Sequence, residues 1–215
     1  DVSRVAGCAL VIVADPAAPQ TETDPLLVLT QLKRLAARAV VLCAGVDGRM
    51  LVERGVRELK YSREKLIGSA PEALASAIRA VVALQVNGSV RDVVLTVMGN
   101  PPANAFVSWE DASIGGCAAT RVLDEPTLRK LSSQIAPLWP PGPHALAHSA
   151  VEAVAAICGV SRRAVSCFVA PDDTLGQRAR VVALPVRLCL SGVESTAIPP
   201  LSGAASTALD NAMLL

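Results

Sequence analysis

The order of apolar and polar positions along the chain predicts short buried strands that alternate with amphipathic helices. Continuous apolar runs at residues 9–14 and 39–43 are typical of strands that lie in a parallel sheet, the first of them as a central strand. The Asp24-Pro25 pair suits the N-cap and first position of a helix, and leucines then recur at helical spacing, at Leu26, Leu29, Leu32 and Leu35. A strand, a helix and a second parallel strand form one βαβ unit, so we expect a doubly wound α/β sheet.

The rest of the chain predicts further helices and an antiparallel sheet near its end. Ser69 and Glu72 have the spacing of a capping box, which predicts a long helix from residue 70 to about residue 86. Other helices are expected over residues 51–60, 124–136, 144–157 and 204–215. Antiparallel strands separated by the turn sequences Asp172-Asp173 and Ser191-Gly192 are expected over residues 163–171, 180–189 and 193–198.

Residues 91–123 form the most distinctive stretch of the chain. The apolar run at residues 93–98 is typical of a strand that is buried on both faces, and the turn sequence Gly-Asn-Pro-Pro follows at residues 99–102. An extended pattern resumes at residues 105–109 and ends at the Gly115-Gly116 pair. Because α/β folds place their chemistry in loops after buried strands, we expect a functional site at the turn.

Composition excludes several classes of protein. Hydrophobic residues make up 52% of the 215 residues and charged residues 18%, which excludes a disordered chain. A net charge of +1, with two Trp, two Phe and one Tyr, favours neither phosphate binding nor base stacking, so we expect no nucleic-acid partner. The apolar runs are far shorter than the roughly 20 residues of a membrane span, so we expect no membrane insertion.

Cysteine and histidine positions do not predict a metal site. The six cysteines occur singly, without a Cys-x-x-Cys pair, and we interpret them as small buried apolar residues of a reducing compartment. His144 and His148 have the spacing of metal ligands on a helix, but no third ligand accompanies them. No bound metal is therefore expected.

The turn and its flanks resemble the segment of the lactate/malate dehydrogenase family that carries the catalytic histidine. In that family a strand leads into Gly-Glu-His-Gly-Asp-Ser and then into an extended run that contains a Trp and an Ala-x-x-x-Gly ending. The matching positions, without a gap, are Gly99, Trp109, Ala112 and Gly116. Pro101 stands at the histidine position and Asn100 at the neighbouring glutamate position. The Ile-Gly-Ser sequence at residues 67–69 and the strand–turn–strand pattern at 165–190 also resemble the family.

The resemblance implies an α/β fold, in which a partial Rossmann-type parallel sheet is followed by the α+β C-terminal domain of lactate/malate dehydrogenases. Residues 1–66 would be the remnant or C-terminal part of the dinucleotide-binding domain, and residues 67–215 the C-terminal, substrate-binding domain. The family's earlier strands and their Gly-x-Gly-x-x-Gly turn would lie upstream of Asp1, and that motif does not occur in this sequence. Ala14, Asp15 and Ala44 stand at family cofactor positions without convincing cofactor chemistry, so no cofactor is expected.

The family's other catalytic positions also hold residues without the required chemistry. The family places on its long helix an aspartate that orients the histidine and an arginine that clamps the substrate carboxylate. One alignment puts Leu74 and Ala77 at these positions, and a shift of one residue puts Ala75 and Ile78 there. Arg79 is the nearest cation, and on this helix we expect it to face solvent. The arginine-bearing lid of the family matches residues 19–24, which contain no arginine.

These observations favour a catalytically inactive, cytoplasmic member of the family. It would act as a structural or regulatory subunit of a homo-oligomer or larger assembly, packed through the alanine-rich helices at residues 73–83 and 145–156. The alternative is an active NAD(P)-dependent oxidoreductase, similar to malate dehydrogenase but with a divergent site. In that case the pocket would be lined by Asn100, Asn104, Glu110, Asp111 or His144, and NAD would be its cofactor.

Overall fold

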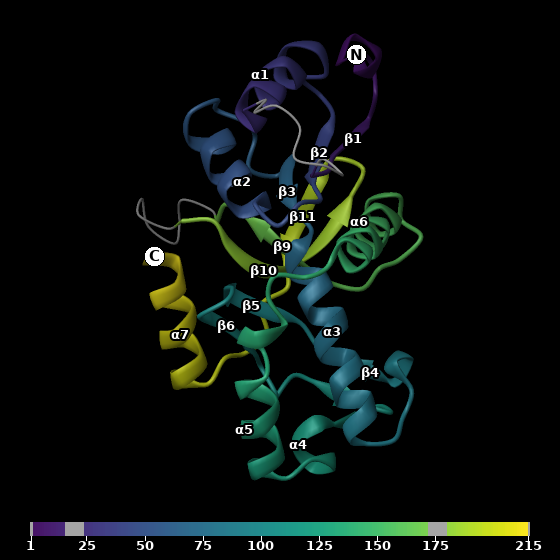
Figure 1. Cartoon of the computed structure of the whole chain (residues 1–215), viewed down its shortest axis with the longest axis vertical. Helices are drawn as coiled ribbons and strands as arrows, with labels where there is room; N and C mark the ends of the chain where they lie inside the picture. Colours follow the sequence, from purple (N-terminus) through teal and green to yellow (C-terminus); the bar gives the residue numbers. More distant parts are fainter. Residues whose placement is uncertain (1, 16–23, 172–179, 215) are drawn as a thin grey trace.

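A mixed β-sheet organises the computed structural model, which describes residues 2–15, 24–171 and 180–214 (Figure 1). The eight-stranded sheet has the order β1-β2-β3-β9-β10-β5-β6, and β11 pairs with β10. Its first three strands are parallel, namely β1 (Leu10–Val13), β2 (Val40–Cys43) and β3 (Leu66–Gly68). The remaining pairings are antiparallel and join β9 (Val165–Val169), β10 (Val182–Cys189), β11 (Gly192–Thr196), β5 (Val97–Asn100) and β6 (Asn104–Val107).

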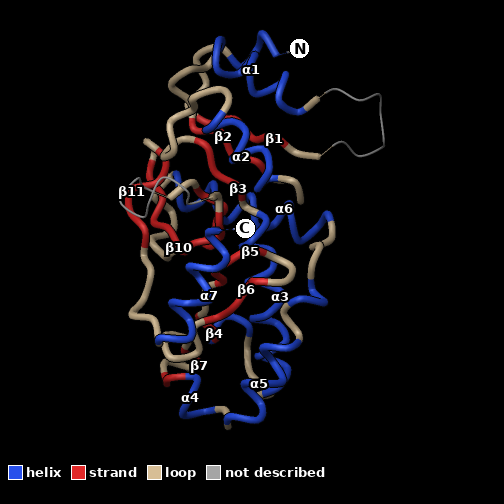
Figure 2. The backbone as a smooth tube through the Cα atoms, turned by 90° about the vertical axis from the view of Figure 1, so that its left-hand side faces the viewer, coloured by secondary structure: helices blue, strands red, loops and turns tan. Residues whose placement is uncertain are grey.

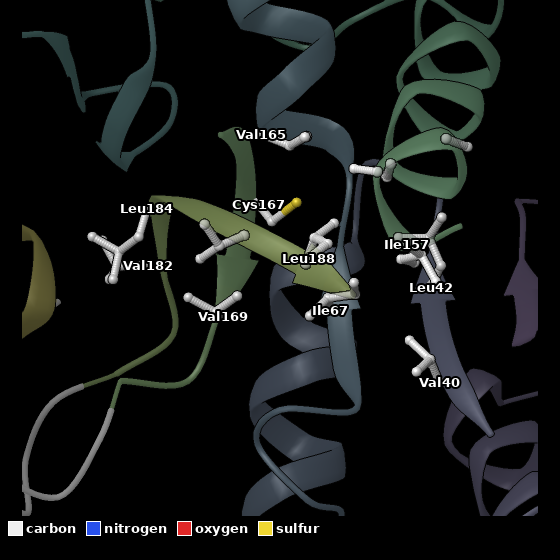
Figure 3. Packing of buried hydrophobic residues seen from close by; sticks show 14 of the residues in the cluster. Val40, Leu42, Ile67, Ile157, Val165, Cys167, Val169, Val182, Leu184 and Leu188 are labelled. Atoms are coloured by element: carbon white, nitrogen blue, oxygen red, sulfur yellow. The ribbon is translucent and has the colours of Figure 1, made fainter. Parts of the chain in front are cut away.

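Helices cover both faces of this sheet because its central strands are apolar on both sides. On β2, Val41 and Cys43 pack with helices α1 (Pro25–Leu35) and α2 (Gly48–Arg57). Val40 and Leu42 point to the opposite face and pack in a cluster with α6 (Pro143–Ile157) and α7 (Gly203–Leu214). Figure 3 shows side chains of β2, β3, β9, β10 and α6 gathered in this second cluster. The period of two along each strand thus divides the core into two layers.

A third apolar cluster lies beyond the sheet, around helix α3 (Ala70–Gln85). A second, three-stranded sheet accompanies this helix, built from β4 (Val93–Val94), β7 (Ser113–Ile114) and β8 (Cys117–Ala118). Helices α4 (Ala119–Val122) and α5 (Glu125–Ser133) complete this end of the molecule, which Figures 1 and 2 show below the large sheet. No helix among the described residues is long and apolar enough to cross a membrane.

Several locally encoded predictions are confirmed. The Asp24 carboxylate accepts a hydrogen bond from the amide of Leu26 at 3.0 Å, and α1 begins at Pro25. The parallel β1–β2 pair, helices α3, α5, α6 and α7, and the antiparallel β9–β10–β11 arrangement all lie within a few residues of their predicted bounds. The predicted turn at Asp172-Asp173 lies outside the described residues. The division of the chain at residues 66 and 67 stays a prediction, and it falls within β3.

Other predictions are wrong, and packing explains why. The run at residues 93–98 is not one strand that is buried on both faces, because β4 and β5 belong to different sheets and Val94 is 61% exposed. The β1 strand lies at an edge of the sheet instead of its centre. Helix α2 spans Gly48–Arg57 instead of residues 51–60. Three of the cysteines that we interpreted as buried are exposed, namely Cys8, Cys117 and Cys158.

The capping box at the start of α3 is also not formed. The helix begins at Ala70 as expected, but the Ser69 side chain makes no capping hydrogen bond, and its buried hydroxyl has no hydrogen-bond partner among the described residues. The Glu72 carboxylate, which would have returned to the Ser69 amide, instead accepts hydrogen bonds from two arginines and from the amide of Ser166. A charge-assisted network therefore replaces the local cap.

Candidate functional site

A groove of 680 Å³ lies next to the turn that the sequence singled out. Its walls are one side of α2, the turn between β5 and β6, the segment before α6, and β9. We call it the α2 groove, and its described lining residues are Val46, Asp47, Arg49, Met50, Glu53, Arg54, Arg57, Glu58, Asn100, Pro101, Trp139 and Phe168. This volume is within the range of small-molecule sites.

The turn between β5 and β6 places Asn100 and Pro101 in the wall of the groove. Gly99 has φ of +96°, and a Cβ atom there would lie 2.0 Å from the carbonyl oxygen of Asn104. Only glycine fits such a close backbone approach. Pro101 is buried and has neither an ionisable group nor an amide hydrogen. The amide side chain of Asn100 is therefore the polar group that this turn presents.

Helix α2 supplies the charges of the groove, and most of them are paired. Arg54 bonds to Glu58 at 2.9 Å, and Arg57 bonds to Glu53 at 3.0 Å, each at i,i+4 spacing. Arg49 differs from them. Its Nε donates to the carbonyl oxygen of Val181 at 2.9 Å, while its Nη2 atom is buried and has no hydrogen-bond partner among the described residues. Burial is the main reason why the pKa of Arg49 lies below its ordinary value. The Glu53 carboxylate opposes this shift, and the nearby Arg180 adds to it.

Two aromatic rings form the apolar wall of the groove. The rings of Trp139 and Phe168 meet edge to face, with centroids 6.1 Å apart and an interplanar angle of 80°. Phe168 is fully buried on β9, whereas Trp139 is partly exposed. The groove therefore combines an aromatic surface, a side-chain amide and one guanidinium that is not paired with a carboxylate.

The positions that match the family's histidine-orienting aspartate and carboxylate-clamping arginine lie elsewhere. Leu74, Ala75 and Ile78 are buried in the apolar cluster around α3, together with side chains such as Val97. Ala77 is half-buried on the same helix. None of these four residues belongs to the described lining of the α2 groove. The structure thus brings Pro101 and Asn100 to the groove but not the α3 positions.

Arg79 does not face solvent, contrary to the prediction. It is only 7% exposed and pairs with Glu72, which is 1% exposed, and it also bonds to the Ser76 hydroxyl at 2.8 Å. Arg163 joins the same Glu72 carboxylate at 3.0 Å and extends the network to Glu152. These charges tie α3 to the start of β9 and to α6, so we assign them a structural role.

The cofactor positions of the family do not form a cradle for a dinucleotide in the described part of the chain. The Asp15 carboxylate accepts the Val46 amide at 3.0 Å, and a Cβ atom on Gly45 would lie 1.9 Å from it. Ala44 is buried in the core, and Ala14 is exposed. A pyrophosphate at the start of α2 would meet the carboxylates of Asp15 and Asp47 instead of free amides.

The residues of the alternative hypothesis are dispersed. Asn100 lines the groove, but Asn104, Glu110, Asp111 and His144 are not among its described lining residues, and the last three are exposed. His148 lies 4.0 Å from Glu152, and no group of three or more potential metal ligands occurs among the described residues. Arg49 and its neighbours on α2 were not predicted as site residues. The signal was present as charges at i,i+4 spacing from residue 49 to residue 58.

Comparison with known proteins supports the family resemblance. No protein-family model matches the sequence. The chain is 22% identical over 184 residues to a malate dehydrogenase of Hydrogenobaculum sp. (strain Y04AAS1), a match that covers 80% of this chain and 55% of that protein. It thus spans about half the length of this curated relative.

Solved structures share the fold. The malate dehydrogenase from Aeropyrum pernix superimposes with a TM-score of 0.85 at 17% identity, over 99% of this chain and 75% of that one. The lactate dehydrogenase from Cryptosporidium parvum gives 0.84 at 18% identity, over 99% of this chain and 74% of that one. The predicted α/β fold is therefore confirmed, and the chain resembles the lactate/malate dehydrogenases in both sequence and fold.

Proposed function

We propose that this chain is a catalytically silent relative of the lactate/malate dehydrogenases that acts as a structural or regulatory subunit of an oligomer. The observation that carries the proposal is the chemistry of the turn between β5 and β6. Reduction of a 2-keto acid needs a group that protonates the forming alkoxide. Pro101, at the family's histidine position, has no proton to give, and Asn100 beside it is a neutral amide.

The surroundings of α3 support the same proposal. The family's chemistry would need a carboxylate at Leu74 or Ala75 and a cation at Ala77 or Ile78. Three of these four positions are buried in an apolar cluster. Arg79, next to Ile78 in the sequence, is already paired with Glu72. Restoring the family's chemistry would therefore require charges in an apolar core, where an unpaired charge is strongly unfavourable. A single substitution at Pro101 would not be enough.

An oligomeric, cytoplasmic subunit is the form that we propose for the protein. Much of the alanine-rich surface of α3 and α6 is already buried within this chain, including Ala73, Ala75 and Ala153. Leu84 and Val151 on the same helices are 79% and 66% exposed, and a partner that covered them would remove apolar surface from water. All six cysteines are free thiols, which suits a reducing compartment. Light scattering tests the assembly, and a monomer at working concentration would argue against it.

Turnover assays test catalytic silence. The purified protein is assayed with NADH or NADPH and pyruvate or oxaloacetate, and in reverse with lactate or malate, beside an authentic malate dehydrogenase. We expect no rate above the blank. An Asn100→Ala variant identifies any contaminant, because a contaminating enzyme gives the same rate in both preparations. A rate that the variant lowers would come from this groove and would favour the active oxidoreductase instead.

A further inference from the structure

We propose that the α2 groove binds a small organic monocarboxylate, with its carboxylate at Arg49 and its apolar body against Trp139. This goes beyond the silent-subunit proposal, because binding here needs neither a nicotinamide nor a proton donor. The site differs in position from the family's clamp, which belongs to α3, since Arg49 lies near the start of α2.

The unsatisfied guanidinium is the first argument. Arg49 uses Nε on a backbone carbonyl, and its buried Nη2 has no acceptor among the residues that the structure describes. A buried charged donor without an acceptor is unfavourable. A carboxylate that enters the groove and reaches this atom would supply the missing acceptor, and two parallel hydrogen bonds then become possible.

The charge balance of the groove limits the ligand to one negative charge. Arg54 and Arg57 are held by Glu58 and Glu53, so their charges are already neutralised. Asp47 is an exposed residue of the groove lining and would repel a second anionic group. Phosphate and dicarboxylates therefore fit less well than a monocarboxylate.

The aromatic wall favours an apolar body behind the carboxylate. Trp139 and Phe168 present ring surface on the β9 side of the groove, and the Asn100 amide can hydrogen-bond to a polar substituent of the ligand. Because Trp139 itself lines the groove, its fluorescence reports on a ligand that contacts the ring. The chain has one other tryptophan, Trp109, whose indole bonds to Ser132 on α5.

Fluorescence titration tests the site in a Trp109→Phe background, where Trp139 is the reporter. Phenylacetate should quench the emission saturably. Phenylacetamide, its neutral isostere, and inorganic phosphate should bind at least about tenfold more weakly. Equal quenching by phenylacetate and phenylacetamide would overturn the assignment, because it would show that the carboxylate is not recognised.

Two charge-matched variants test Arg49. Arg49→Gln should weaken phenylacetate binding by about tenfold or more, because a charge-assisted hydrogen bond is lost. Arg54→Gln removes the same charge from the same groove but leaves the Arg57–Glu53 pair in place, so the affinity should stay within about twofold. Arg49→Lys retains the positive charge but not the planar guanidinium with its two parallel donors, so this variant should bind phenylacetate with intermediate affinity. Unchanged affinity in a folded Arg49→Gln protein, checked by circular dichroism, would overturn the proposal, whatever the turnover assays show.

Discussion

Replacing Glu72 by glutamine tests the buried ion network at the start of α3. In the native structure Oε1 of Glu72 accepts from Arg79 and Arg163, and Oε2 accepts the Ser166 amide at 2.9 Å. A glutamine has one acceptor oxygen, so it can retain either the bonds from the two arginines or the bond from the Ser166 amide. If its oxygen accepts from Ser166, its amide group faces two guanidinium donors.

The loss of stability in Glu72→Gln arises mainly from Arg79. Arg163 can turn to Glu152, to which it is already bonded. In the native structure burial lowers the pKa of Arg163, but the carboxylates of Glu72 and Glu152 outweigh this effect and raise that pKa above its ordinary value. Arg79 has no other carboxylate partner among the described residues, and it would remain buried beside a neutral group. Removing one partner of a buried pair costs about 3–5 kcal/mol. We expect a loss on the order of 3 kcal/mol for Glu72→Gln, because the glutamine retains one acceptor.

Urea unfolding followed by tryptophan fluorescence measures this loss. With an m-value of about 2–3 kcal/mol/M, the midpoint should fall by about 1 M or more. The matched control is Glu125→Gln, whose partner Arg129 lies 3.3 Å away in an exposed i,i+4 pair. This control should change stability by less than about 0.5 kcal/mol. In a double-mutant cycle, Arg79→Met should offset part of the Glu72→Gln loss. A Glu72→Gln loss no larger than that of the control would refute the reasoning.

Two further substitutions probe the core and the turn. Tyr61→Phe removes the 3.0 Å hydrogen bond from the phenol to the Leu29 carbonyl and should cost about 1 kcal/mol near neutral pH. Burial, with a smaller effect of Cys43, raises the pKa of Tyr61 from 10.0 to about 12, so the wild-type protein should lose stability as the pH rises through this interval, when the unfolded phenol ionises first. The phenylalanine variant should show a flatter decline in alkaline urea titrations, and an equal slope would contradict the assignment. Gly99→Ala should destabilise by about 3 kcal/mol or more, because its Cβ would lie 2.0 Å from a backbone oxygen. Gly116→Ala, at φ of +79° with open space around it, should cost only about 1–2 kcal/mol, and similar thermal shifts for the two variants would exclude the clash.

Local signals explain which parts of the fold could be predicted from the sequence. The Asp24-Pro25 cap and the Cys158-Gly159 helix stop act within one turn of backbone, and both are present, with Gly159 at φ of +74°. The prediction of one buried strand over residues 93–98 was wrong because a continuous apolar segment does not reveal where a chain passes from one sheet to another. The predicted capping box of Ser69 and Glu72 is not formed because the Glu72 carboxylate accepts a hydrogen bond from the Ser166 amide instead.

The candidate site could be predicted only in part. The 99–102 turn was found because glycine and proline mark its backbone, and it does line the α2 groove. Arg79 was misplaced because its partner Glu72 lies seven residues away on the same helix, beyond the i,i+4 spacing at which helix side chains usually pair. Arg49 was missed because its distinguishing features, a bond to Val181 and a buried amino group without an acceptor, arise only from long-range packing.

A single-turnover experiment tests the central claim most directly. The protein, in excess over NADH, is mixed with oxaloacetate or pyruvate, and NADH absorbance is followed, so that even one slow reduction per site is detected. Because Pro101 cannot donate a proton, we predict a flat trace that matches the buffer blank. NADH consumption that scales with protein concentration and slows in the Asn100→Ala variant would contradict the account.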